Sequence, residues 1–170
     1  MKKVHLAAII VSILIVALVL FSWVGYLLSI EPEIKQVENV TRNSNENFFF
    51  REEVWSYPIM GYAINTSYEN ITLGIATDRD KLHFGRIPLN SSSRKQVDIN
   101  VAKKAGVIFY KAGNMTPYII MPEPFILEGE TKKITLRFEA NDQGNYTGTF
   151  VIRNIIPKNI ISEKVMEVMV

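Results

Sequence analysis

The sequence predicts an all-β protein, an antiparallel β-sandwich preceded by a single N-terminal transmembrane helix. Residues 6–30 contain no charged side chain. From Phe48 onward, short apolar or alternating runs recur at intervals of about 8–12 residues and are separated by turn residues. No long stretch there has the 3.6-residue period of a helix. The 170 residues therefore divide into a membrane segment and one ordinary domain.

The apolar run over residues 6–30 is long enough to cross a bilayer. At about 1.5 Å per residue it exceeds a hydrocarbon core of about 30 Å. The alternative is a cleaved signal peptide, whose apolar core normally spans only about 7–15 residues. Lys2 and Lys3 precede the run, whereas the first charged residues after it are acidic. The positive-inside rule then makes residues 1–5 a cytoplasmic flank and puts everything after residue 30 outside the cell.

Composition excludes several classes of function. The chain has no cysteine, which rules out a thiol nucleophile, a thiolate zinc site and disulfides. It carries 19 Lys and Arg against 17 Asp and Glu, and two of the lysines precede the apolar run. The outer part is therefore neutral and has no basic surface for nucleic acid.

Asn-x-Ser/Thr sequons are enriched on the predicted outer side. Chance predicts about one or two, given the Ser and Thr content. The chain has six, the candidate glycosylation sites Asn39, Asn65, Asn70, Asn90, Asn114 and Asn145. Asn114 is the weakest of these because Pro117 follows its threonine. Sequons in an outer domain without a disulfide favour a prokaryotic surface glycoprotein, and among those an archaeal one.

The outer part begins with a polar segment. Residues 31–47 have few large apolar side chains, so we expect a stalk or partly ordered linker, with the domain spanning 48–170. The expected strands are 48–57, 59–65, 71–77, 81–87, 94–101, 106–111, 118–121, 131–139, 146–153 and 163–170. The clearest is 131–139, where Ile134, Leu136 and Phe138 alternate with polar residues, as in a half-buried strand.

Two segments resemble the immunoglobulin-like superfamily. Residues 142–146 (DQGNY) are similar to the D-x-G-x-Y pattern of the tyrosine corner, which would assign that role to Asp142, Gly144 and Tyr146. In that motif the tyrosine hydroxyl bonds to nearby main chain. The sequence departs from antibody-type domains two residues later, where Gly148 stands in the cysteine position.

The second segment is residues 82–88 (LHFGRIP), followed by 91–100 (SSSRKQVDIN). It is similar to the L-x-F-G-x-V-P-x-G-S opening of hydin-type and major-sperm-protein-like domains. Residues 125–130 (FILEGE) and 144–149 (GNYTGT) resemble later steps of that pattern in the same order. The resemblance covers residues 81–152. It implies an Ig-like sandwich that serves as a binding or scaffolding module, and fold alone does not fix function.

The sequence offers no catalytic, cofactor-binding or metal site. His83 is the only histidine beyond the cytoplasmic flank, so a hydrolase triad or a histidine zinc site cannot be assembled there. Asp78 and Asp80 would hold Ca²⁺ only with a third carboxylate from another loop, and we interpret them as turn residues.

The largest aromatic cluster is Phe48-Phe49-Phe50 with Trp55 and Tyr57. Core packing is the main expectation. A membrane-proximal or partner-facing patch is the alternative, because three consecutive aromatic residues in a strand cannot all face one core.

These observations predict a single-pass, membrane-anchored cell-surface protein. Its extracellular Ig-like domain is expected to be a non-catalytic binding or structural module of the cell envelope, without a cofactor. The expected partner is an envelope or surface-layer protein. Two alternatives stay open: a subunit of a surface appendage, archaellum stator-like or pilin-like, and a secreted carboxylate- or metal-dependent hydrolase.

Overall fold

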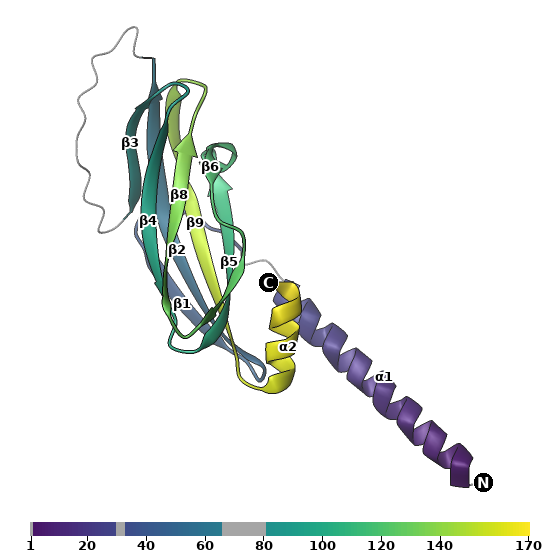
Figure 1. The fold of residues 1–170 in the computed structure, drawn as a ribbon. Coiled ribbons are helices and arrows are strands. Elements are labelled where there is room, and N and C mark those ends of the chain that lie inside the picture. Colours follow the sequence, from purple (N-terminus) through teal and green to yellow (C-terminus); the bar gives the residue numbers. More distant parts are fainter. Residues whose placement is uncertain (1, 30–32, 66–80) are drawn as a thin grey trace.

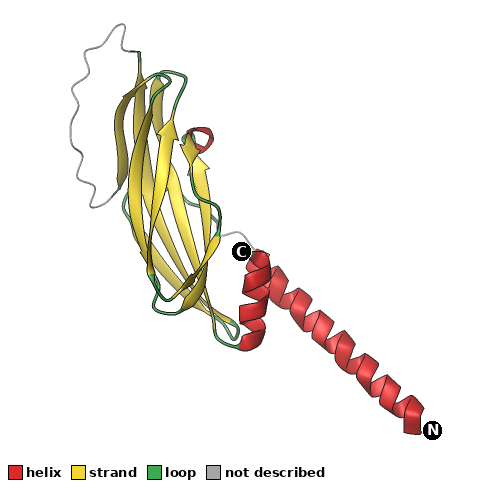
Figure 2. Cartoon of the chain, in the orientation of Figure 1, coloured by secondary structure: helices red, strands yellow, loops and turns green. Residues whose placement is uncertain are grey.

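A long β domain carries a helix that extends from one end, as Figure 1 shows. The computed structural model describes residues 2–29, 33–65 and 81–170. In this part of the chain the elements are α1 (Lys2–Ser29), β1 (Thr41–Glu46), β2 (Phe50–Ile64), β3 (Leu82–Pro88), β4 (Ser92–Asn100), β5 (Lys104–Gly113), the short 3-10 helix η1 (Thr116–Tyr118), β6 (Ile119–Ile120), β7 (Phe125–Glu128), β8 (Thr131–Glu139), β9 (Gly144–Pro157) and α2 (Ile160–Met169). Strands dominate the domain (Figure 2), which confirms β-sheet structure behind an N-terminal apolar helix.

The strands form two sheets. The larger has the order β1-β2-β9-β5-β7, with β3 also on β2, and the smaller has the order β4-β8-β6. Neighbouring strands are antiparallel except for β2 and β3, which are parallel. β1 and β3 share one edge of β2, because β1 pairs with residues 51–56 and β3 with residues 59–64.

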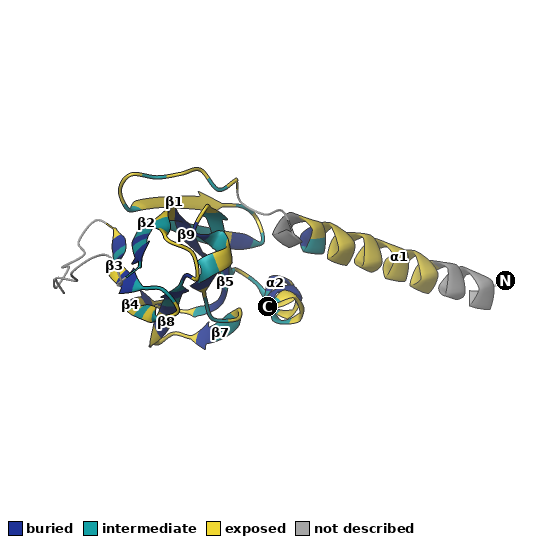
Figure 3. Cartoon of the chain, turned by 90° about the horizontal axis from the view of Figure 1, so that it is seen from above, coloured by how far each residue is buried: buried dark blue, intermediate teal, exposed yellow. Residues whose placement is uncertain are grey.

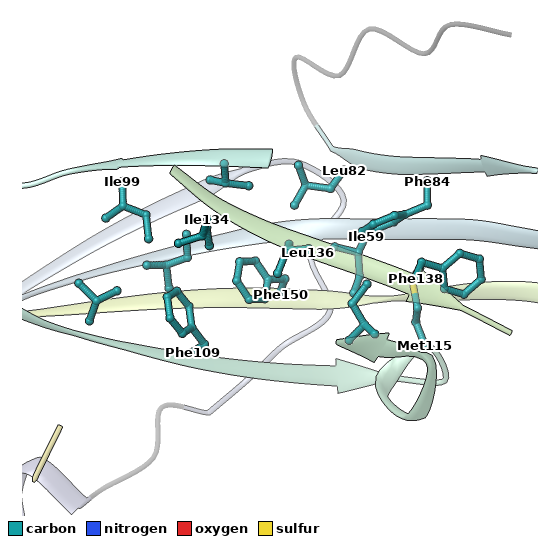
Figure 4. Close-up of a cluster of buried hydrophobic side chains, with 14 of the residues drawn as sticks. Ile59, Leu82, Phe84, Ile99, Phe109, Met115, Ile134, Leu136, Phe138 and Phe150 are labelled. Atoms are coloured by element: carbon teal, nitrogen blue, oxygen red, sulfur yellow. The ribbon is translucent and has the colours of Figure 1, made fainter. Parts of the chain in front are cut away.

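The main core lies between the two sheets. In β8, Ile134, Leu136 and Phe138 are buried, whereas Thr135 and Arg137 between them are not, so the alternation predicted from the sequence is confirmed. Facing them from the larger sheet are side chains such as Phe109 and Phe150 (Figure 4). Removal of this apolar surface from water is the main source of stability of such a domain.

Close backbone approach explains the glycine at position 148. A Cβ atom on Gly148 would collide with the carbonyl oxygen of Ala112 in β5. Gly113, opposite it in the ladder, has φ +99°, and a Cβ there would lie 2.6 Å from the Gly148 Cα. The two strands therefore meet here with no room for a side chain.

The expected strands 48–57 and 59–65 are one continuous strand, β2. Pro58 lies between the residues that pair with β1 and those that pair with β3. Among the described residues, that edge of β2 has no partner at this point, so a residue without an N–H group is tolerated there. The expected strand 71–77 lies outside the described residues.

The prediction of a strand over residues 163–170 is wrong, because α2 occupies this segment. Asn159 starts the helix with a capping box: its Oδ1 accepts from the Ser162 N–H (2.9 Å), and Ser162 Oγ accepts from the Asn159 N–H (3.1 Å). The buried residues Ser162, Val165 and Met166 have helical spacing and face the protein. The domain is therefore not purely β.

The prediction of a stalk over residues 31–47 also needs correction. β1 forms within it and pairs with β2, although all six of its residues are exposed. The preceding segment lies on the sheet, where Thr149 Oγ1 donates to the Lys35 carbonyl and accepts from the Val37 N–H, both at 3.3 Å. The polar composition of residues 31–47 led to the wrong prediction. An edge strand is held by main-chain hydrogen bonds, which need no apolar side chain.

Candidate functional site

α1 is the one helix in the described ranges that is long and apolar enough to cross a membrane. Such a helix is a membrane anchor or a signal sequence. Its described side chains, at residues 9–26, are largely exposed, and this part of the helix is mostly yellow in the cartoon of Figure 3. Val24 is the exception, because none of it is exposed.

Val24 belongs to a small second core, here called the junction core. Its buried members come from α1, β2, β9 and α2 and are Val24, Phe50, Ile155, Val165 and Met166. Phe49, Ile108, Ile126 and Val170 pack against them. The junction core lies on the outer face of the larger sheet, away from the main core, and it joins α1 to the domain.

α2 reaches the sheet because β5 has a glycine beneath it. A Cβ atom on Gly106 would lie 2.7 Å from Val170 Cγ2 and 2.9 Å from Met166 Cγ. A larger residue at this position would therefore push α2 outward.

An ion cluster holds the other side of α2. The Lys104 ammonium lies 2.9 Å from Glu163, 2.6 Å from Glu167 and 3.3 Å from Glu128. Hydrogen bonds from Lys104 and then Lys164 lower the pKa of Glu167 to about 2. The hydrogen bond to Glu163, followed by those to the other two carboxylates, raises the pKa of Lys104. Both pKa shifts favour the charged forms. The ion pairs between these charged groups hold α2 against β5.

A cleft opens between the two sheets at the other face. It has a volume of about 220 Å³ and is lined by Trp55, Tyr57, Asp98, Ile99, Asn100, Ile152 and Asn154. Asn154 is only 4% exposed, and its Oδ1 has no hydrogen-bond partner among the described residues. The Arg42 guanidinium lies 4.7 Å from the centre of the Trp55 ring. A buried acceptor without a partner costs free energy, so a donor group in this cleft would stabilise the protein.

A second, more polar hollow adjoins the cleft and shares Asn100 with it. Its volume is about 550 Å³, and its charged lining residues are Arg42, Glu46, Arg51, Glu53, Lys103 and Lys158. Asn154 and Asp98 were not predicted from the sequence as residues of a site. Asn154 lies within the apolar run of β9. A polar residue at such a position was the signal in the sequence that could have indicated a buried polar site.

The predicted tyrosine-corner residues lie together at the start of β9. The Tyr146 hydroxyl donates to the Asp142 carbonyl at 2.7 Å, and the ring is buried. Burial is the main cause that raises the pKa of Tyr146. Its ring lies 4.5 Å from that of Tyr118 and 5.5 Å from that of Phe138. A Cβ on Gly144 would lie 3.6 Å from Tyr146 Cζ, an ordinary contact.

The sequons differ in how their side chains are used. Asn39, Asn90 and Asn145 are exposed and Asn65 is half-buried, whereas Asn70 lies outside the described residues. Asn114 is exposed, but its Nδ2 donates to the Asn145 carbonyl (3.3 Å) and its Oδ1 accepts from the Thr147 N–H (2.7 Å). Asn114 thus links the segment after β5 to β9.

His83 was the histidine considered for a catalytic or metal site. This residue lies half-buried in β3, with its ring 5.8 Å from that of Tyr62. Asp78 and Asp80 lie outside the described residues. Among the side chains that are described, no three of His, Asp or Glu could hold a metal ion.

The three consecutive phenylalanines have separate environments. Phe50 is buried in the junction core, and Phe49 packs against that core. Phe48 is 79% exposed. The expectation of core packing is therefore wrong for Phe48, since an aromatic residue in the turn after β1 has no core to face.

No protein-family model, curated protein or solved structure matches this chain. A proposal for its function therefore rests on the geometry of the junction core and the cleft.

Proposed function

We propose that the chain is a single-pass, membrane-anchored cell-surface protein whose β domain is a non-catalytic binding or structural module of the cell envelope. The burial of Val24 carries this proposal. Cleavage of α1 as a signal sequence would remove Val24 and uncover Phe50 and Met166. Exposure of apolar surface costs about 25 cal/mol per Å². A permanent anchor keeps the junction core intact.

The orientation rests on charge. Lys2 and Lys3 favour the cytoplasmic side, which puts the domain and its sequons outside. The Tyr146 to Asp142 hydrogen bond and the two facing sheets support an Ig-like sandwich. Such a domain without a disulfide but with many sequons fits an archaeal surface glycoprotein that contacts an envelope or surface-layer protein.

The cleft is the surface we assign to partner binding. A donor on the partner would satisfy Asn154 Oδ1, while Trp55 and Tyr57 offer ring area beside it. This chemistry positions a ligand.

Anchoring is tested on the full-length, C-terminally tagged protein in cells of the source organism. We expect it to stay in membranes after alkaline carbonate extraction, with peptides before Val24 still present in its mass spectrum. A soluble protein that has lost α1, Val24 included, would overturn the anchor.

Partner binding is tested by a photo-crosslinking residue in place of Asp98, which is exposed at the rim of the cleft. The matched control carries it in place of Gln143, in the exposed turn before β9. We expect an envelope protein crosslinked only from position 98, and loss of that adduct with Asn154→Leu. Equal adducts from both positions, or none, would contradict a binding role for the cleft.

A further inference from the structure

Exposed apolar side chains gather beside the junction core. Phe48 is 79% exposed, Ile160 77%, Ile161 56% and Val168 75%. We call these four residues the apolar patch. They come from two segments far apart in the sequence, the turn between β1 and β2 and the helix α2. Exposed apolar residues that gather in this way mark an interaction surface.

Main-chain contacts hold the two segments of the patch together. The Lys158 N–H donates to the Phe49 carbonyl at 2.9 Å, and Lys158 Nζ donates to the Asn47 carbonyl at 2.7 Å. The start of α2 therefore lies directly beside the turn that carries Phe48.

Ring contacts connect the patch to α1. Phe48 meets Phe49 edge to face with ring centres 5.1 Å apart, and Phe49 meets Trp23 of α1 at 6.2 Å. At the other end of α2, a Cβ on Gly25 would lie 4.0 Å from Met169 Sδ. Figure 1 shows α2 beside the end of α1 from which the domain continues. The patch thus lies level with the last turns of α1.

The position of the apolar patch beside the last turns of α1 determines what covers it. Trp23 and Tyr26 are the aromatic residues at this end of the apolar helix, where such rings favour the membrane–water interface. Trp23 contacts Phe49, so the patch cannot lie far from the depth at which Trp23 sits. A bilayer crossed by α1 is therefore within reach of the patch in every copy of the protein.

The exposed face of α2 has the composition of an interfacial helix. Ile161, Lys164 and Val168 follow one another at helical spacing and are all exposed. Lysine in this setting buries its alkyl chain and extends its ammonium toward lipid phosphates. The opposite face, with Val165 and Met166, is already covered by the domain.

We propose that the apolar patch inserts into the interfacial layer of the bilayer leaflet next to the domain, so that the domain rests on the membrane surface. This inference depends on the proposed function, because it requires α1 to span the bilayer. It makes the protein a module of fixed height and orientation in place of a domain on a flexible stalk.

Because the chain contains no cysteine, a single introduced cysteine can be labelled at one chosen position. Single-cysteine variants of the full-length chain, Phe48→Cys and Ile161→Cys, are spin-labelled and reconstituted in vesicles of phosphatidylcholine and phosphatidylglycerol. Leu14→Cys reports on the span, and Gln143→Cys is the control in an exposed turn of the domain. Collision rates with oxygen and with a water-soluble nickel complex give the depth of each label.

We expect labels at 48 and 161 to favour oxygen and to collide with nickel severalfold less often than the label at 143. If position 14 is in lipid while 48 and 161 collide with nickel as often as 143, the patch is in water and this inference fails alone. If position 14 is itself open to nickel, the proposed anchor fails. Protection from both reagents with dipolar broadening between labels would show that a second copy covers the patch, which also overturns the inference.

A serine variant separates lipid contact from a folding defect. Phe48→Ser in the chain labelled at 161 should raise nickel collisions there, because it removes the largest apolar side chain of the patch. The circular dichroism spectrum should stay unchanged, since Phe48 is exposed. Unchanged nickel collisions would show that Phe48 does not hold the domain on the membrane.

Discussion

A single methyl group at Gly61 is expected to force the two sheets apart. A Cβ atom there would lie 2.7 Å from Cε1 and 2.9 Å from Cδ1 of Phe138, whereas ordinary contacts begin at 3.4 Å. The Phe138 ring is fully buried and has the rings of Phe84 and Tyr146 beside it, with centres 5.7 and 5.5 Å away. Because these neighbours enclose the ring, we expect β2 and β8 to separate by about 0.7 Å in Gly61→Ala.

Overpacking of this kind lowers the free energy of unfolding by about 1–3 kcal/mol. For a domain of this size, that corresponds to a fall in Tm of about 4–12 °C. Gly144→Ala is the matched control, because its Cβ would lie no closer than 3.6 Å to Tyr146. Both substitutions restrict the unfolded chain equally, so the difference between them reports on the folded state.

The assay is thermal unfolding of the full-length chain in detergent micelles, followed by near-ultraviolet circular dichroism. A double-mutant cycle with Phe138→Leu, which frees space beside Gly61, should show that Gly61→Ala costs at least about 0.5 kcal/mol less in that background. Equal Tm values for the two glycine variants, or strict additivity in the cycle, would refute the packing argument.

Three further outcomes follow from contacts in the domain. Because the pKa of Glu167 is lowered to about 2 from 4.5, its stabilising effect is complete above pH 4.5 and is lost as the pH falls toward 2. As the pH falls through that window, the protection factors of the α2 amides, which are corrected for the intrinsic pH dependence of exchange, should fall, and they should fall less in Lys104→Met; equal falls would contradict the role of the ion cluster. Glycopeptide mass spectrometry should find Asn114 unmodified, because both polar atoms of its amide are bonded to main chain; a glycan there would show that this link is dispensable. Tyr146→Phe should lower stability by about 1 kcal/mol through loss of the hydrogen bond to Asp142, and an unchanged Tm would be inconsistent with that bond.

The sequence predicted those strands whose side chains alternate between core and solvent. β8 is the clearest, since Ile134, Leu136 and Phe138 all face the core. The parallel pairing of β2 with β3 had no local signal, because β3 takes the part of the β2 edge that β1 leaves unpaired. α2 was missed although Asn159 and Ser162 form a capping pair, because the apolar residues after them were read with a period of two.

The candidate site was less predictable than the fold. Burial of Val24 requires contact with α2, about 140 residues later in the chain, and no periodicity within α1 reveals it. The cleft was equally hard to predict from the sequence, because Asn154 becomes a buried acceptor without a partner among the described residues only after β4 packs over β9. The three phenylalanines did carry a usable signal: they could not share one core, and Phe48 does not.

The junction core also imposes an order on biosynthesis. Val24 is synthesised about 140 residues before Val165 and Met166, so α1 can enter the membrane long before its cover exists. Contacts between such distant segments form late in folding. Until α2 docks, the apolar surface of Val24, Phe50 and Ile155 lacks the cover that Val165 and Met166 provide. Only a chain synthesised beyond residue 166 can close the junction core, so this step distinguishes finished protein from incomplete chains.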